Sequence, residues 1–285
     1  MKNHRHCVVA ACFAGIILSC VPAHSFAAEK RNDGWKSLFN GKNLDGWYIY
    51  LAKHQKNEDT NHLVQIHDGA VHMYLDAKNG TQQSFGYIST EKNYSNYHLR
   101  FEYKWGTKRF GARAMAKRDA GVIYHMFGGD NVWPSGVECQ VQEGDVGDVF
   151  TVNTRVATTV DANTTNLVDL VVTNAVGVAI TNKTSRPTFL TAKDGGIPIV
   201  QGLATSIRRI VRNPMNEHEG WNKVEVIVRG DSSTHIVNGK TNNVAGKMER
   251  FVNGEWVPLT EGKIILQLEG AEVFYRNIEI RELER

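Results

Sequence analysis

The sequence predicts an all-β sandwich, and three observations support this fold class. Apolar and polar residues alternate with a period of two in segments 99–105, 223–229 and 263–268, as they do in strands with one buried face. Asn238-Gly239 and Asn253-Gly254 are tight-turn dipeptides flanked by strand-like residues. No long stretch has helical periodicity. We therefore expect a sandwich of many strands in which one sheet curves around a polar face.

The first 27 residues have the pattern of a secretory signal peptide. Lys2 and Arg5 precede a short apolar stretch, and small residues before and at Ala27 offer a cleavage site. The apolar stretch is short for a membrane span. A lipoprotein cleavage site at Cys20 is the alternative, and it would leave a lipid anchor. We expect an exported protein, periplasmic or extracellular.

The mature chain, 28–285, is expected to form a single β-sandwich domain. The full sequence is 41% hydrophobic and 22% charged, which is typical of a soluble globular protein. The formal net charge of +3 falls to +1 when the two basic residues of the signal are removed, so nothing favours nucleic acid as a partner. Of four cysteines only Cys139 remains, which excludes an intramolecular disulfide.

Segment 149–200 differs from the rest in composition. It is rich in Thr, Val, Asn and Ala and poor in aromatic and charged residues. Because it has too few large apolar residues for a core of its own, we expect extra hairpins or long loops inserted in the same domain. Segment 205–214 is expected to form a short helix that ends near Pro214.

Several common catalytic motifs are absent. Segment 238–241 ends like a phosphate loop but lacks the first glycine, and segment 218–222 begins like a zinc-protease helix but lacks the second histidine. The sequence has no Gly-x-Ser-x-Gly elbow and no Cys-x-x-Cys pair. Nucleotide chemistry, zinc proteolysis and serine-esterase chemistry are therefore disfavoured.

The segment 138–142 is the most informative part of the chain. Side chains alternate across a strand, so Glu138, Gln140 and Gln142 share one face while Cys139 and Val141 share the other. The apolar pair suits the core. One carboxylate and two amides suit the hydroxyls of a sugar, whereas ordinary glycosidases need two carboxylates.

Short motifs follow one another along most of the mature chain, from about Trp35 to Leu283. They are Ser37 to Trp47, Gly86 to Thr90, Leu99 to Trp105, Asp119 to His125, Val132 to Pro134, Gly136 to Gln142, Trp221-Asn222, Asn238-Gly239 and Gly262 to Leu283. In their order and number they resemble the 3-keto-disaccharide hydrolase family, long known as a domain of unknown function.

This resemblance implies a concanavalin-like jelly-roll β-sandwich with a concave polar sheet, related in shape to lectins and glucanases. It also implies cleavage of glycosides already oxidised to a ketone at sugar carbon 3. Many members have Asn-Ser-Gly and an Arg at the positions of Asp119-Ala120-Gly121 and His125. Segment 149–200 matches the family poorly.

A ketone at carbon 3 acidifies the proton on carbon 2. A base can remove that proton, the group on carbon 1 can then leave, and water can add back. This route needs a base, a stabiliser for the enolate oxygen and a proton donor. We assign His125 as base or proton shuttle, because its ordinary pKa lies near neutral pH, and Glu138 as its catalytic partner.

Six further residues are expected to bind substrate. They are Lys104, Trp133, Gln140, Gln142, His235 and Arg276. Lys104 or Arg276 would stabilise the enolate oxygen, the two glutamines would hold sugar hydroxyls, and Trp133 would stack on a ring. Structural roles remain open for both histidines, and an exposed charged sheet face remains open for Lys104.

We predict no cofactor but leave a divalent metal open, since His125, Glu138 and Asp148 carry suitable ligand atoms at a spacing that matches no metal motif. The expected partner is an oligosaccharide or glycoside. Two rival functions stay open. One is a non-catalytic, lectin-like module. The other is a conventional β-glucanase, which would need a second carboxylate opposite Glu138.

Overall fold

The computed structural model describes residues 33–284, except 167, 174–178, 206, 208 and 212–215. The chain divides into Met1–Asp33 and Gly34–Arg285. The expected signal peptide and the alternative lipid anchor at Cys20 lie outside the described residues. Within the described part, no helix has the length and apolar character that a membrane span requires.

One antiparallel sheet carries the polar face that the sequence analysis singled out. Its seven described strands run in the order β14 (Arg209–Ile210), β9 (Val149–Val152), β8 (Ser135–Gln142), β7 (Asp119–Phe127), β19 (Lys263–Leu268), β5 (Gly86–Thr90) and β2 (Trp47–Leu51). We call it the small sheet.

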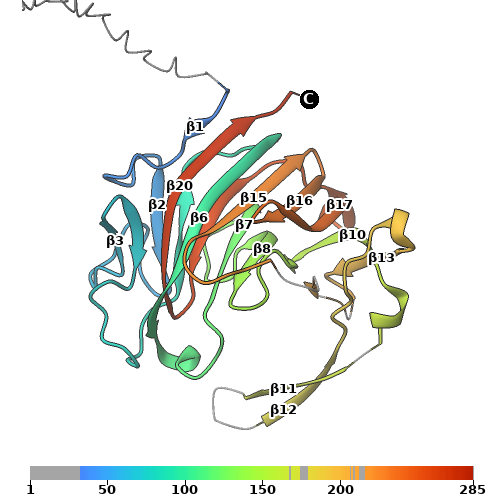
Figure 1. Cartoon of the computed structure of the whole chain (residues 1–285), viewed down its shortest axis with the longest axis horizontal. Coiled ribbons are helices and arrows are strands. Elements are labelled where there is room, and N and C mark those ends of the chain that lie inside the picture. The colour runs from blue at the N-terminus through green and yellow to red at the C-terminus, as the bar shows by residue number, and fades with distance from the viewer. Residues whose placement is uncertain are drawn as a thin grey trace, which may run out of the picture. The chain divides into compact units, whose positions relative to one another are not determined.

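A larger antiparallel sheet packs against it (Figure 1). Its path in the described residues is β13 (Ile197–Gly202), β10 (Thr154–Val160), β17 (Lys240–Val252), β16 (Ser232–Val237), β15 (Asn222–Arg229), β6 (Tyr97–Arg109), β20 (Ala271–Glu282), β4 (Ala70–Met73) and β3 (Val64–His67). Beside this path, β1 (Lys36–Ser37) pairs with β20 and β18 (Glu255–Pro258) pairs with β17. We call it the large sheet.

The core between the two sheets is built by the alternation seen in the sequence. Leu99, Phe101 and Tyr103 of β6 are buried, and so are Cys139 and Val141 of β8. All belong to one apolar cluster that both sheets share. Burial of apolar area at about 25 cal/mol per Å² drives the sheets together. The predicted all-β, jelly-roll sandwich is therefore confirmed.

Both tight turns lie where the dipeptides predicted them. Asn238 and Gly239 connect β16 to β17 with φ of 49° and 77°, and Asn253 and Gly254 connect β17 to β18 with φ of 50° and 89°. Positive φ at both central residues is the geometry of a two-residue hairpin, which Asn and Gly adopt most readily.

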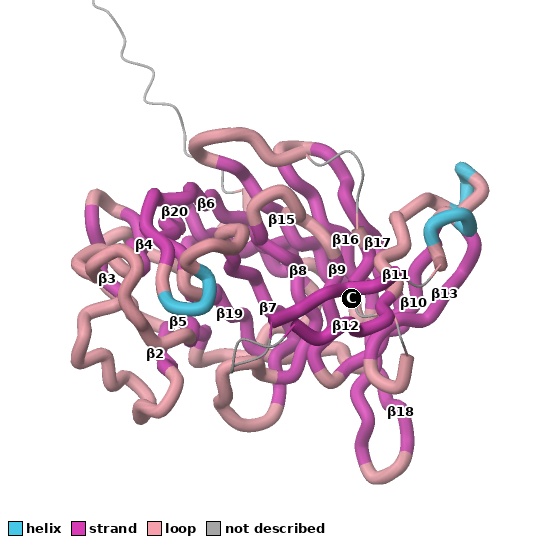
Figure 2. Tube along the Cα trace, turned by 90° about the horizontal axis from the view of Figure 1, so that it is seen from below, coloured by secondary structure: helices cyan, strands magenta, loops and turns pink. Residues whose placement is uncertain are grey.

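The unusual segment 149–200 forms strands in three places. Its strands β10 and β13 pair with each other at the edge of the large sheet, and β9 joins the small sheet. A separate hairpin is formed by β11 (Val168–Thr173) and β12 (Ala179–Thr184), and Figure 2 shows it with the projecting β17–β18 hairpin. The described helices are single 3₁₀ turns, η1 (Gly111–Arg113), η2 (Ala162–Thr164) and η3 (Ala192–Asp194).

The short helix expected in segment 205–214 is not what the described residues show. Arg209–Ile210 instead form strand β14, paired with β9. Pairing with an available sheet edge satisfies the backbone N–H and C=O groups of these two residues, and this outweighs a weak local preference for helix.

Candidate active site

A pocket of about 420 Å³ opens on the outward face of the small sheet, away from the core. Polar residues from β7, β8, β14, η1 and the turn after β19 converge on it, and β9 forms one wall. The lining residues are Arg113, Asp119, Trp133, Glu138, Gln140, Gln142, Phe150, Thr151, Val152, Asn153, Arg209 and Glu269. The predicted face of Glu138, Gln140 and Gln142 therefore lines a cavity large enough for a sugar.

Glu138 lies at the centre of β8 and is 5% exposed. Its strand partner is Ile123, and the neighbouring Gly121 of β7 leaves room for the carboxylate. A Cβ added at Gly121 would lie 2.1 Å from Glu138 Oε1 and 2.1 Å from Gln267 Oε1. Glycine is thus required here because two polar side chains occupy the space above it.

A second carboxylate, Asp119, stands at the start of β7 and orders the two glutamines. Its Oδ1 accepts a hydrogen bond from Gln140 Nε2 and its Oδ2 accepts one from Gln142 Nε2, both at 2.7 Å. Arg113 Nη2 lies 2.7 Å from the same Oδ2. The amide N–H groups that the sequence analysis offered to substrate are therefore engaged with Asp119.

A third carboxylate completes the pocket. Glu269, in the turn between β19 and β20, is 5% exposed and lies 3.3 Å from Arg113 Nη2. On the opposite side, Arg209 Nε donates to Asp148 Oδ2 at 2.6 Å and Arg209 Nη1 donates to Gln142 Oε1 at 3.2 Å. The premise of a single carboxylate on this face was wrong, because strand β7 and the turn after β19 each bring another.

Burial dominates the electrostatics of this pocket. Desolvation, together with the charge of Asp119, raises the pKa of Glu138 to about 8 against the pull of the two arginines. Desolvation and the neighbouring acids also raise the pKa of Glu269 well above its ordinary value. Desolvation raises the pKa of Asp119 as well, although Arg113 and Gln142 oppose it. Burial therefore shifts all three carboxyl groups of the pocket toward their protonated forms, and Glu138 titrates closest to neutral pH.

The rim of the pocket is aromatic. Trp133 lines the mouth and is 44% exposed. Its ring stands edge-on to Phe85, with centroids 6.2 Å apart. An exposed indole beside a polar pocket suits the apolar face of a sugar ring. The structure thus brings Trp133, Gln140 and Gln142 to Glu138, as the sequence analysis expected.

His125 is placed elsewhere. It is fully buried in a bulge of β7, with φ of 52°, and its ring nitrogens face the backbone carbonyls of Leu259 at 3.2 Å and Ser95 at 3.4 Å. Desolvation lowers its pKa. The bulge turns this side chain into the core, away from the face that carries Glu138. We therefore withdraw the pairing of His125 with Glu138.

His235 also lies in the core and not in the pocket. Its Nε2 lies 2.9 Å from the hydroxyl of Tyr124 and its Nδ1 lies 3.2 Å from the carbonyl of Gly147. Complete burial lowers its pKa to about 4. A neutral imidazole held by two protein groups is a structural histidine, so His235 is not available to bind substrate.

Lys104 and Arg276 lie together on the outward face of the large sheet. Lys104 Nζ is 4.7 Å from the ring centre of Phe274 and 5.1 Å from that of Trp221. The Arg276 guanidinium is 3.8 Å from the Trp221 ring centre, and its Nε donates to Glu102 at 2.7 Å. Both point away from the core on the side opposite Glu138, so neither can reach an enolate oxygen in the pocket.

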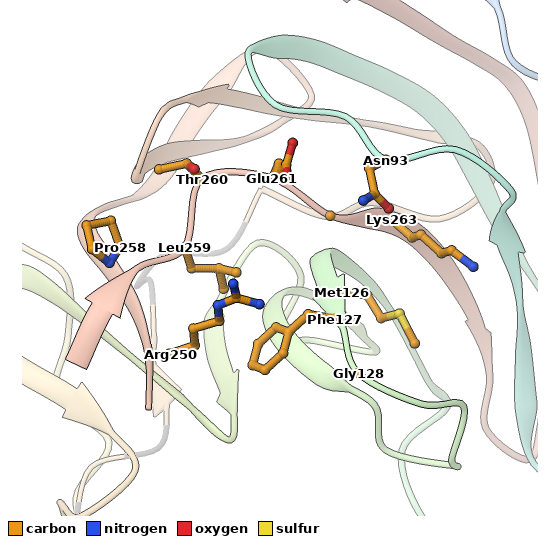
Figure 3. A pocket seen from close by; sticks show the side chains of 11 residues that line it. Asn93, Met126, Phe127, Gly128, Arg250, Pro258, Leu259, Thr260, Glu261 and Lys263 are labelled. Atoms are coloured by element: carbon orange, nitrogen blue, oxygen red, sulfur yellow. The ribbon is translucent and has the colours of Figure 1, made fainter. Parts of the chain in front are cut away.

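A second pocket, of about 320 Å³, lies at the other end of β7 and β19. Figure 3 shows Arg250 beside Phe127 and Leu259, with Glu261 on the loop across from Arg250. Glu261 is exposed and is the one carboxylate among the residues that line this pocket. Without a buried acid it offers less for proton transfer than the pocket at Glu138.

The conceivable metal ligands are not assembled. Asp148 is ion-paired with Arg209 and His125 bonds to backbone carbonyls, so neither joins Glu138. Among the residues that the structure describes, no group of three or more His, Cys, Asp or Glu is arranged to hold a metal ion.

Four charged residues of the pocket escaped the sequence analysis: Arg113, Asp119, Arg209 and Glu269. A signal existed for Asp119, since it shares parity with Gly121 on a strand whose other face is apolar. The positions of the other three residues depend on which strands lie side by side, and local sequence does not reveal that pairing. Arg209 was assigned to a helix and so was given no place in a sheet.

Three comparisons with known proteins bear on identity. No curated protein matches the chain. A glycosyl-hydrolase candidate from Parabacteroides distasonis is 19% identical, with a TM-score of 0.49, 88% of this chain covered and 94% of the other. Carbohydrate-binding module CBM66 from Bacillus subtilis is 10% identical (TM-score 0.38, coverage 82% and 94%), and a Bacillus licheniformis β-glucanase is 11% identical (TM-score 0.38, coverage 88% and 97%).

The family comparison covers nearly all of the sandwich. The family model described as "3-keto-alpha-glucoside-1,2-lyase-like domain" matches residues 34–281, from the segment before β1 to the penultimate residue of β20. The family resemblance found in the sequence motifs is thereby confirmed. The polar pocket and the family match both indicate a carbohydrate-active, glycosidase-type protein. The chain belongs to the family of 3-keto-alpha-glucoside-1,2-lyase-like domains.

Proposed function

We propose that the chain is an exported enzyme that cleaves 3-keto glycosides by removing the proton on carbon 2, eliminating the group on carbon 1 and adding water. One observation carries the proposal. Three buried carboxyl groups share one sugar-sized pocket, and the pKa of each is raised. A proton acceptor and a proton donor therefore coexist near neutral pH, as elimination requires.

Glu138 is the base. With a pKa of about 8, about a tenth of it is ionised at pH 7, and this ionised form is a far stronger base than an ordinary carboxylate. The side chain lines the cavity, and Gly121 beneath it gives the carboxylate the room to stand there. Carbon 2 of a bound sugar can approach the carboxylate there.

Glu269 is the proton donor and the arginines stabilise the enolate. Burial and the neighbouring acids raise the pKa of Glu269 well above its ordinary value, which favours the protonated form that can protonate the departing oxygen. Arg113 lies between Asp119 and Glu269, and Arg209 stands across the pocket. Positive charge fixed in a buried pocket stabilises an oxyanion more strongly than it would in water.

The chemistry balances as a net hydrolysis. Glu138 takes the proton from carbon 2, and the electron pair forms an enolate on the carbon 3 oxygen. The enolate re-forms the ketone, a double bond forms between carbons 1 and 2, and the bond from carbon 1 to the leaving oxygen breaks while Glu269 supplies its proton. Water then adds to carbon 1 and gives its proton to Glu269, while Glu138 returns a proton to carbon 2, so both carboxyl groups regain their starting protonation states.

The test compares a disaccharide with its 3-keto form in deuterated water. We expect release only from the 3-keto form, with deuterium at carbon 2 of the product. Gly121→Ala should slow release at least about tenfold by displacing Glu138. Gly246→Ala is the matched control, because a Cβ there meets nothing within 4 Å, and it should leave the rate of release unchanged. Equal cleavage of the ordinary disaccharide would overturn the proposal.

A conventional glycosidase is the second candidate, and the observation in its favour is the presence of Asp119 and Glu269 near Glu138. Such enzymes need two carboxyl groups that flank the scissile bond. Cleavage of the unoxidised disaccharide without deuterium at carbon 2 would select this mechanism. Binding of either sugar without any product would select a lectin-like module.

A further inference from the structure

Beside the pocket, the outward face of the small sheet is unexpectedly apolar and buried. Tyr48 and Tyr87 are 1% and 0% exposed, and they cluster with Ile123, Met126 and Ile265. These side chains point away from the core, so only a covering segment can exclude water from them. The loop that joins β7 to β8, residues 128–134, lies at this position and contacts both tyrosines through Asp130.

Asp130 is held by two hydroxyl groups at once. Its Oδ1 accepts hydrogen bonds from Tyr48 and Tyr87, both at 2.7 Å. Burial, and the negative charge of Asp130, raise the pKa of both tyrosines, so each stays a donor across the working pH range. Hydrogen bonds from two buried donors to one charged oxygen are stronger than neutral ones.

A further hydrogen bond within the loop connects the position of Asp130 to that of Trp133. Asn131 Oδ1 accepts the backbone N–H of Trp133 at 3.0 Å, and the following Pro134 is buried. The indole thus stands on a short, internally bonded loop that Asp130 links to the sheet through hydrogen bonds to Tyr48 and Tyr87. Trp133 is at the pocket mouth, while Asp130 has no atom in the pocket lining.

We propose that Asp130 is a positioning residue, which fixes the β7–β8 loop so that the Trp133 indole stands over the mouth of the pocket and stacks on the sugar. This rests on the proposed function, because the sugar is the ligand of that pocket. Loss of the two hydrogen bonds leaves the loop in place only part of the time. Substrate affinity then falls, while the chemistry at Glu138 stays intact.

The experiment uses the full chain with Asp130→Ala, Asp130→Asn and, as a control, alanine at the exposed Asp45. With the 3-keto disaccharide, Asp130→Ala should raise KM about fivefold to tenfold with kcat within about twofold. Asp130→Asn keeps an acceptor oxygen and should recover most of the affinity. In a Trp133→Ala background, Asp130→Ala should change KM no further, because the two residues act through one contact.

A second readout needs no catalysis. Acrylamide quenching of each variant, minus that of the same variant with Trp133→Phe, reports the exposure of the Trp133 indole alone. It should rise in Asp130→Ala and stay unchanged in Asp45→Ala. Unchanged quenching, or a KM effect that adds fully to that of Trp133→Ala, would overturn the inference. If no glycoside is turned over, the quenching still decides the role of Asp130 while the proposed function fails.

Discussion

Two glutamates on opposite outward faces of the sandwich have the same small solvent-exposed fraction, yet their pKa values move in opposite directions. Glu272, on the large sheet, and Glu138, on the small sheet, are each 5% exposed. Desolvation raises the pKa of Glu272, but His72 at 2.9 Å and the backbone N–H groups of Thr107 and Lys108 outweigh it, and the net shift is downward.

Within the described residues, no hydrogen bond reaches the Glu138 carboxylate, and its pKa rises to about 8. The difference is one of donors and of depth, because Glu138 lacks the donors that Glu272 has and is also surrounded more closely by protein. A buried acid with donors is neutralised by its surroundings and acts as structure. A buried acid without donors keeps or exchanges its proton, and it is therefore available for chemistry. The comparison assigns Glu272 to stability and Glu138 to reactivity.

The largest expected effect is on activity at Glu138. Glu138→Gln should lower kcat/KM by about 10² to 10⁴ because the amide cannot take a proton. The fold should be at least as stable as that of the wild type, since a desolvated acid has been replaced by a neutral group. Turnover of the 3-keto disaccharide and urea unfolding measure the two effects. Near-normal turnover would remove Glu138 from the mechanism.

Glu272→Ala should lower the stability of the fold and leave activity unchanged, the reverse of Glu138→Gln. It leaves His72 and two backbone N–H groups without their acceptor, which should cost about 2–4 kcal/mol of unfolding free energy. Activity measured well below the melting temperature should stay unchanged. Glu272→Gln keeps an acceptor oxygen and should cost less. If both variants were fully stable, the hydrogen bonds seen at Glu272 would not be what holds this part of the large sheet.

The pH dependence of stability should separate the two acids by sign. A carboxyl whose folded-state pKa is raised binds more protons when folded, so its contribution is fully present below the unfolded pKa and is lost as pH rises toward the folded value. For Glu138 this window runs from about pH 4.5 to about 8. For Glu272 the pKa is lowered, so stability is lost only as pH falls below the ordinary glutamate range.

Unfolding free energies at pH 5, 6.5 and 8 test this expectation. Relative to Glu138→Gln, the wild type should lose stability as pH rises toward 8. Relative to Glu272→Gln, its stability should stay constant between pH 6.5 and 8, above the range in which His72, bonded to Glu272, titrates. Differences are used because His125 and His235, which are buried neutral, titrate in the opposite sense at lower pH. Equal slopes for the two differences would mean that both glutamates meet the same environment.

Sequence alone could predict the sandwich and the inward–outward parity of its strands, because a period of two in apolar residues follows directly from strand geometry. It therefore placed Glu138 on a polar face and Cys139 in the core. It could not predict the companions Asp119 and Glu269, since these come from β7 and the end of β19, which only strand pairing brings beside β8.

The errors have local causes too. His125 has the parity of the pocket face, but a bulge with φ of 52° adds one residue to β7 and turns the ring inward. Lys104 has the correct outward parity on the wrong sheet. Alternation shows which residues point outward, but not which of the two outward faces they occupy, and no pattern within one strand contains that information.

The smallest expected effect concerns Arg276, the enolate stabiliser that the sequence suggested on the large sheet. Arg276→Ala removes an ion pair with Glu102 and a contact with the Trp221 ring, and its side chain is 39% exposed. Exposed pairs contribute about 0–1 kcal/mol, so stability should barely change, and kcat/KM should stay within about twofold. Arg113→Ala, in the pocket, should instead lower kcat/KM by about 10² or more. If Arg276→Ala lowered kcat/KM more than Arg113→Ala did, the reaction would take place on the face of Glu272, and the roles assigned to the two sheets would be reversed.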